Sequence, residues 1–216
     1  DPEGGTALGE ILREMDSLEN LNLDGNAFGN TGATAIALGL GGKPALQGFS
    51  LSFCGVGVVG TIHLAELLSA SISSLQNLFL AGNRQRFNSG PFPRMQLPRD
   101  RCVLRHVDLS DVGLGDGGVI ALSDLLLCCH DLRILSLADN GISCFGVARL
   151  VCALTHCSVL RDLSLARNEI GNEGARMLSS LLLACADMVV LDVSHNKIGT
   201  SGVVFFSKAV DRCWNP

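Results

Sequence analysis

The chain has 216 residues, of which 47% are hydrophobic and 17% are charged, and its formal net charge is −5. A chain of this length can bury roughly 70% of the surface that it exposes when unfolded, so we expect a continuous apolar core. The negative charge disfavours a nucleic-acid-binding module that works by neutralising phosphates, and no run of about 18 uncharged apolar residues is available to span a membrane. The chain has nine Cys, an odd number, and its first residues lack a signal-peptide pattern. Both features favour free thiols in a reducing compartment. We therefore expect a cytoplasmic location.

One sequence template recurs along the chain: L-x-x-L-x-L-x-x-N/C, followed by an apolar residue and a helical stretch that begins with Gly. It is clearest at Leu160, Leu163, Leu165 and Asn168. The template opens seven times, at spacings of 28 or 29 residues: Leu18, Leu46, Leu75, Leu104, Leu132, Leu160 and Met188. Such a regular spacing predicts a repeat architecture.

Residues 1–17 come before the first of these positions and carry the second half of the template. The apolar spacing in residues 4–12 matches the spacing in residues 174–182. We expect a helix here, as the remaining half of an eighth repeat. Because a solenoid cut through a repeat leaves an open strand edge, we also expect a longer chain, with more repeats or another domain before Asp1.

Each repeat changes its apolar period halfway. The L-x-L pair, as at Leu135 and Leu137, has the alternation of a short strand, and the second half has the i, i+4, i+7, i+8 spacing of one helix face. One strand and one helix cannot bury their apolar faces alone, so the copies must stack. We predict a right-handed α/β solenoid with horseshoe curvature, in which parallel strands line the concave side and helices the convex side.

The residue that follows each strand is usually Asn, whose amide can bond the backbone of the turn. In chain order this position holds Asn26, Cys54, Asn83, Val112, Asn140, Asn168 and Asn196. Val112 departs from the pattern, so we expect the turn at 111–113 to be satisfied in another way.

The third repeat departs most from the template. Its residues 84–102 contain three prolines, which are incompatible with a regular helix, so we predict an extended loop in place of one helix. Residues 84–105 hold six Arg and one Asp. Arg can bind carboxylate or phosphate and Phe can anchor a partner, although a degenerate repeat plugged by its own apolar residues is the other interpretation. The partner-binding candidates are Arg84, Arg86, Phe87, Phe92, Arg94, Arg99 and Arg101.

Four cysteines occupy one position in successive repeats, and His130 and His156 lie beside two of them. The four are Cys129, Cys157, Cys185 and Cys213. A metal or redox site is one interpretation, but zinc sites need about four ligands, usually with two of them only a few residues apart. We favour small buried apolar residues at the helix-to-strand joints and expect neither a metal nor a cofactor.

The outward strand positions are mostly small and polar, without the Trp, Tyr and Arg that dominate binding hot spots. They include a row of carboxylates, Asp24, Asp108, Asp162 and Asp192. This row is either a contact for a basic partner or ordinary solvated surface. On this face the partner-binding candidates are Phe79, Asp108, Asp162 and Asp192.

The repeats resemble the ribonuclease-inhibitor-like subclass of leucine-rich repeats. The resemblance rests on the repeat length, on Gly-Ala at the helix start (Gly32-Ala33, Gly174-Ala175) and on Cys three residues before the next Leu. It implies a surface for binding other proteins, and it covers nearly the whole chain. Such repeats serve many unrelated partners, so the resemblance implies a fold more than a function.

The function we expect is that of an intracellular, non-catalytic protein-interaction scaffold, of the kind found in ciliary and cytoskeletal assemblies. Its partners would be other proteins rather than nucleic acid, a membrane or a small-molecule substrate. One alternative is the ligand-sensing repeat region of a NACHT-type innate immune receptor. A second is a GTPase-activating protein of the Ran type, in which an exposed Arg84 or Arg86 would stabilise charge during phosphoryl transfer.

Overall fold

The computed structural model describes residues 1–71, 73–84, 102–185 and 187–214. Within them, helices and strands alternate along nearly the whole chain. The strands are β1 (Asn20–Asn22), β2 (Gly48–Ser50), β3 (Asn77–Phe79), β4 (His106–Asp108), β5 (Ile134–Ser136), β6 (Asp162–Ser164) and β7 (Val190–Asp192). The helices are α1 (Pro2–Leu12), α2 (Gly29–Gly39), α3 (Val58–Ser71), α4 (Gly115–Leu126), α5 (Cys144–Leu154), α6 (Asn172–Ala184) and α7 (Thr200–Trp214).

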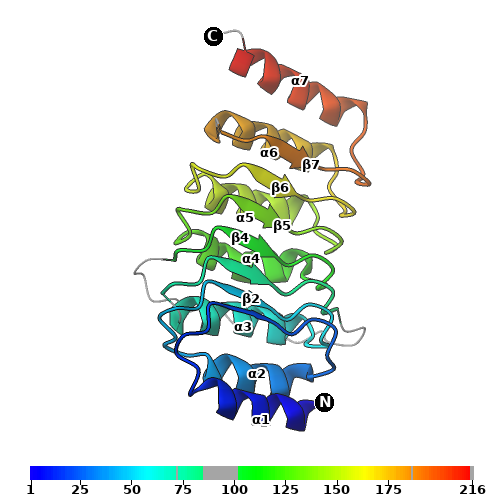
Figure 1. The fold of residues 1–216 in the computed structure, drawn as a ribbon. Helices are drawn as coiled ribbons and strands as arrows, with labels where there is room; N and C mark the ends of the chain where they lie inside the picture. The colour runs from blue at the N-terminus through cyan, green and yellow to red at the C-terminus, as the bar shows by residue number, and fades with distance from the viewer. Residues whose placement is uncertain (72, 85–101, 186, 215–216) are drawn as a thin grey trace.

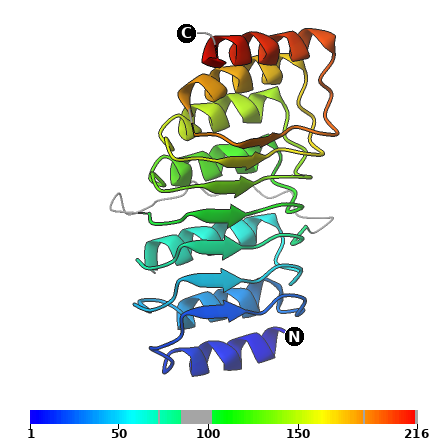
Figure 2. The same cartoon turned by 45° about the horizontal axis from the view of Figure 1, so that its top comes forward.

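The seven strands form one open parallel sheet in sequence order, and the helices lie together on one side of it (Figures 1 and 2). Each strand begins two residues after the opening position of its repeat, so that the middle residues pair in register, as Leu135 does with Leu163. The predicted stack of strand–helix units around a parallel sheet is confirmed.

The core runs without a break through the space between sheet and helices. Strand-middle residues such as Leu78, Leu135 and Leu163 are fully buried, and each buried Leu contributes about 1.5–3 kcal/mol. The middle residues of β1 and β7 are only half-buried, because these strands form the two edges of the sheet. Each repeat is therefore buried by its neighbours.

Helices α1 and α2 pack unusually closely at the N-terminal end of the solenoid. A Cβ atom on Gly39 would overlap the carbonyl oxygen of Gly9, so only glycine fits at this crossing. Beside it, the buried Lys43 donates to the carbonyl oxygen of Arg13 and to Asp16 Oδ1, the latter at 2.6 Å. These contacts fasten the predicted N-terminal helix to the first complete repeat.

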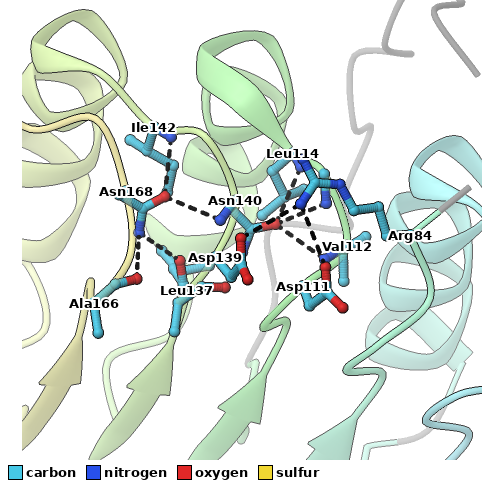
Figure 3. A network of polar contacts seen from close by, with 12 residues as sticks. Arg84, Asp111, Val112, Leu114, Leu137, Asp139, Asn140, Ile142, Ala166 and Asn168 are labelled. Carbon is cyan, nitrogen blue, oxygen red and sulfur yellow. Dashed lines mark hydrogen bonds and ion pairs between the residues drawn. The ribbon is translucent and has the colours of Figure 1, made fainter. Parts of the chain in front are cut away.

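A column of buried asparagines connects the turns that follow the strands (Figure 3). The side-chain oxygen of Asn140 accepts hydrogen bonds from three consecutive N–H groups at 3.0 to 3.1 Å: those of Val112, Gly113 and Leu114. Its amide nitrogen donates to the Leu109 carbonyl oxygen at 2.8 Å. Asn168 treats the next turn in the same way, accepting from the N–H groups of Asn140 and Ile142. Each asparagine thus supports the turn of the repeat before its own.

The expectation about the turn at 111–113 is wrong, because Asn140 satisfies that turn in the ordinary way. Each Asn bonds the turn of the repeat before its own. Because position 112 holds Val, the turn that lacks a side-chain amide is the preceding one, at Asn83 and Arg84. That turn comes directly before residues 85–101, where the sequence departs from the repeat template. The break in the column and the departure from the repeat template therefore fall at the same place.

Replacing the Asn140 side chain should destabilise the fold strongly. Asn140→Ala removes the acceptor of three N–H groups and leaves buried backbone groups without a partner, a loss that costs about 3–5 kcal/mol. The control is Asn26→Ala, at the exposed end of the same column, where we expect about 1 kcal/mol or less. Urea unfolding followed by circular dichroism measures the free energy of unfolding of both variants. Equal decreases in the two variants would show that the buried amide stabilises the fold no more than the exposed one.

Candidate functional site

The outward face of the sheet carries a hollow, lined by β1 and by residues at the ends of β2 to β4, which we call the sheet hollow. It is open to solvent and mixes apolar, hydroxyl and carboxylate side chains. Its lining residues are Asn20, Leu21, Asn22, Asp24, Ser50, Ser52, Phe53, Phe79, Ala81, Asp108 and Ser110. The hollow therefore brings together two of the residues predicted for this face, Phe79 and Asp108, and adds Asp24 and Phe53.

Phe53 is the most prominent side chain of the sheet hollow, with 66% of its surface exposed. Its backbone has a φ of +57°, a left-handed conformation that is rare for a bulky residue. The ring lies over Gly82, where a Cβ would overlap it. Gly82 itself has a φ of +65°, so two features of this position require glycine. The turn thus holds an aromatic ring outward on a backbone support.

The left-handed conformation is shared by the residue before each asparagine-column position. These residues are Gly25, Phe53, Gly82, Asp111, Asp139, Arg167 and His195. A side chain in this conformation costs roughly 1–2 kcal/mol relative to glycine, and Phe53 is the only one of the seven that is large and apolar. Phe53 is absent from the candidates predicted from the sequence, although a large apolar residue at this repeat position distinguishes it when the repeats are aligned.

The second aromatic residue of the hollow, Phe79, contacts His106 on the neighbouring strand. Their ring centroids are 4.7 Å apart, with the planes at 80°. Burial of the imidazole lowers the pKa of His106, and the nearby carboxylates of Asp108 and Asp162 oppose this shift only in part. The surroundings of His106 therefore favour its neutral form beside an aromatic ring.

The predicted acidic row has a structural role as well as an exposed one. Asp24 Oδ1 accepts from Ser50 Oγ at 2.5 Å and from the Ser52 N–H at 2.7 Å. Asp108 and Asp192 each accept from the N–H group two residues later, at 2.9 Å. That hydrogen bond from Ser194 holds the pKa of Asp192 below its usual range. Three carboxylates of the predicted row are therefore fixed at the strand ends, Asp108 and Asp192 by their own repeat and Asp24 by the next one.

The structure describes only the first of the predicted loop candidates. Arg84 Nη1 lies 3.4 Å from Asp139 Oδ1 and 3.6 Å from Asp111 Oδ1 (Figure 3). The guanidinium reaches across two neighbouring repeats and is half-exposed. The remaining candidates lie outside the described residues: Arg86, Phe87, Phe92, Arg94, Arg99 and Arg101.

The repeated cysteines lie in the core. Cys129, Cys157 and Cys185 are buried free thiols, and Cys157 Sγ donates to the Cys129 carbonyl oxygen at 3.3 Å. Burial raises the pKa of Cys157 to about 12, so this thiol is a poor nucleophile. Among the described residues, no three His, Cys, Asp or Glu side chains are grouped to bind a metal ion, and no helix is long and apolar enough to cross a membrane. The side chain of Cys213 lies outside the described part.

Comparisons with known proteins agree with the repeat architecture. A family model described as "Leucine Rich repeat" matches residues 16–37, 102–123, 156–179 and 184–207. Among solved structures, a tropomodulin C-terminal domain from Caenorhabditis elegans matches with a TM-score of 0.51 at 13% identity, covering 97% of this chain and 93% of that chain. The sequence matches no curated protein. The predicted leucine-rich-repeat solenoid is thus confirmed, and the ribonuclease-inhibitor-like subclass stays a prediction.

The titration of His106 tests the electrostatics of the sheet hollow. We expect its midpoint in an NMR titration to lie below 6.5, the ordinary His value. Because the folded pKa is lowered, stability is full above the unfolded pKa and is lost as the pH falls through the folded value. Phe79→Ala should expose the imidazole and move the midpoint upward, whereas Phe145→Ala, on α5, should leave it unchanged. A wild-type midpoint at or above 6.5 would contradict the burial of His106.

Proposed function

We propose that this chain is a non-catalytic protein-interaction scaffold whose sheet hollow binds a segment of a partner protein that is both basic and apolar. The observation that carries the proposal is the exposed ring of Phe53, held over Gly82 in a left-handed turn. It lines the same hollow as Phe79, Asp24 and Asp108.

The apolar part of the partner follows from Phe53. Most of this side chain is exposed to water, and burying a Phe side chain contributes about 1.5–3 kcal/mol. Its orientation is fixed by the backbone of the next repeat, so little conformational entropy is lost on binding. Aromatic residues held on a rigid support are the usual anchors of protein interfaces. A partner that covers Phe53 with an apolar side chain would gain this energy.

The basic part of the partner follows from Asp24 and Asp108. Both carboxylates use Oδ1 for hydrogen bonds within the strand ends. In the described part of the chain, no Lys or Arg forms an ion pair with either of them. Two fixed carboxylates beside an aromatic ring match a segment in which Arg or Lys alternates with apolar residues, because Arg can bind a carboxylate bidentately.

A cytoskeletal setting belongs to the same proposal. The tropomodulin domain is similar in fold at 13% identity, so it supports the architecture and leaves the setting as our prediction. The GTPase-activating alternative gains nothing from Arg84, whose guanidinium is engaged by Asp111 and Asp139. It rests on Arg86, which lies outside the described residues.

The sheet hollow can be tested with labelled peptides in which Arg alternates with Leu, compared with peptides in which Glu replaces Arg. Fluorescence anisotropy should show that the Arg–Leu peptide binds and that Phe53→Ala weakens binding by about 10- to 30-fold, equivalent to about 1.4–2 kcal/mol. Asp24→Asn and Asp108→Asn keep the Oδ1 acceptor, and each should weaken binding and reduce its salt dependence. Phe145→Ala removes a Phe that is 75% exposed on the helix side. An equal loss in that control would sink the proposal.

The predicted loop is a second candidate surface of the same scaffold. A variant with Ser at Arg84, Arg86, Arg94, Arg99 and Arg101 should lose partners that depend on the loop and keep those captured by the sheet hollow. Quantitative pull-downs with this variant and with Phe53→Ala compare the two surfaces. Retention of the same proteins by wild type and the five-Ser variant would reduce the loop to a degenerate repeat.

A further inference from the structure

Three arginines lie in one column along the edge of the sheet where the strands begin, and we call them the arginine ladder: Arg105, Arg133 and Arg161. They precede the first residues of β4, β5 and β6, and all three are exposed. In the other repeats this position holds Glu19, Gln47, Gln76 and Val189. The three cations therefore occupy consecutive repeats only in the C-terminal half of the sheet.

The backbone fixes the spacing of the ladder. The Arg133 N–H donates to the Arg105 carbonyl oxygen at 2.8 Å, and the Arg161 N–H donates to the Arg133 carbonyl oxygen at 2.8 Å. Neighbouring parallel strands lie about 4.8 Å apart, so the three Cα atoms span roughly 10 Å. Three like charges are held close together on a rigid edge.

Among the described residues, no ion pair engages the arginine ladder, although Asp131 lines the same pocket as Arg105. Elsewhere, Arg84, Arg176 and Lys197 each lie against a carboxylate. In residues 1–71, 73–84, 102–185 and 187–214, none of the three ladder guanidiniums forms an ion pair or a side-chain hydrogen bond. Their mutual repulsion is relieved when an anion binds across them.

We propose that the arginine ladder binds an acidic segment of a partner protein through its carboxylates. Carboxylates three or four residues apart on a helix have Cβ atoms about 5–6 Å apart, close to the strand spacing. Three such carboxylates along one helix face can each be bound bidentately by one guanidinium. The partner is thus a segment with Glu or Asp repeated once per helical turn.

A nucleic acid fits the ladder less well than a short acidic segment. The phosphate backbone is a long array of negative charge, whereas the ladder is three residues long and the whole chain carries a net charge of −5. Asp131 and Asp187 are exposed in the loops that lead into β5 and β7. Asp187 belongs to the repeat after Arg161, so its carboxylate repels an anion that extends beyond this end of the ladder. Asp131 lies beside the ladder itself, two residues before Arg133.

This interaction is separate from the proposed function of the sheet hollow, which selects the opposite charge. The two surfaces share no residue, because the hollow is lined by β1 and by residues at the ends of β2 to β4, whereas the ladder residues precede β4 to β6. A scaffold with both could bind two partners at once. Phe53→Ala should leave binding at the ladder unchanged, so the two proposals fail independently.

The test uses the whole 216-residue chain and a labelled Ala-rich helical peptide with Glu at every fourth position. Fluorescence anisotropy compares the wild type with a triple variant, Arg105→Gln, Arg133→Gln and Arg161→Gln. The matched control is Arg13→Gln, Arg149→Gln and Arg176→Gln, which removes three exposed arginines from the helix side and has the same net charge. We expect the ladder variant to bind at least about tenfold more weakly and the control to stay within about twofold of wild type.

Several outcomes would overturn the proposal. They are no binding of the Glu peptide by the wild type at low salt, equal losses in the two triple variants, or equal binding of a peptide with Gln in place of Glu. Tighter binding of a single-stranded DNA of equal charge, lost in the ladder variant, would assign the site to nucleic acid instead. Circular dichroism and a thermal unfolding midpoint like that of the wild type show that the ladder variant is folded, so that its loss of binding belongs to the arginines.

Discussion

The structure depends on a buried amide that serves two repeats at once. Asn140 and Asn168 each accept hydrogen bonds from the turn of the preceding repeat and donate to carbonyl oxygens in both repeats. A turn buried between neighbours has no water to satisfy its N–H groups, so the amide is the partner that makes burial possible. It also fixes the position of each repeat relative to the next. The apolar core then stabilises a stack whose register the amides have set.

A fixed register turns sequence spacing into spatial columns. Residues 28 or 29 apart come to lie on neighbouring strands, about 4.8 Å from each other. The thiols of Cys129, Cys157 and Cys185 form such a column inside the protein, and the three ladder arginines form one on an edge. The chemistry of a solenoid surface is therefore decided column by column. A run of one residue type in a column makes an extended site, and a single unusual residue makes a local one.

The asparagine column is interrupted at Cys54 and Val112. Cys54 Sγ donates to the Leu23 carbonyl oxygen at 3.2 Å, so the thiol replaces the donor of the amide but offers only a weak acceptor. The residue before Cys54 is Phe53, the exposed ring of the sheet hollow. The residue before Val112 is Asp111, to which Arg84 is paired. Both interruptions adjoin residues that we connect with partner binding. Proteins commonly depart from the local sequence rules of their fold at functional sites.

The fold could be predicted from the sequence because burial acts on residue type alone. The L-x-L pairs and the apolar helix faces must be buried wherever the strands lie, and the structure places every strand two residues after its predicted opening position. The candidate site depends on features that residue type does not encode. The orientation of Phe53 follows from a left-handed backbone and from the missing side chain of Gly82. Asn140 bonds the turn of the preceding repeat because the two repeats are stacked against each other. The expectation for Val112 was wrong because it treated each turn as self-contained, whereas in the stacked fold the N–H groups of a turn are bonded by the Asn of the next repeat.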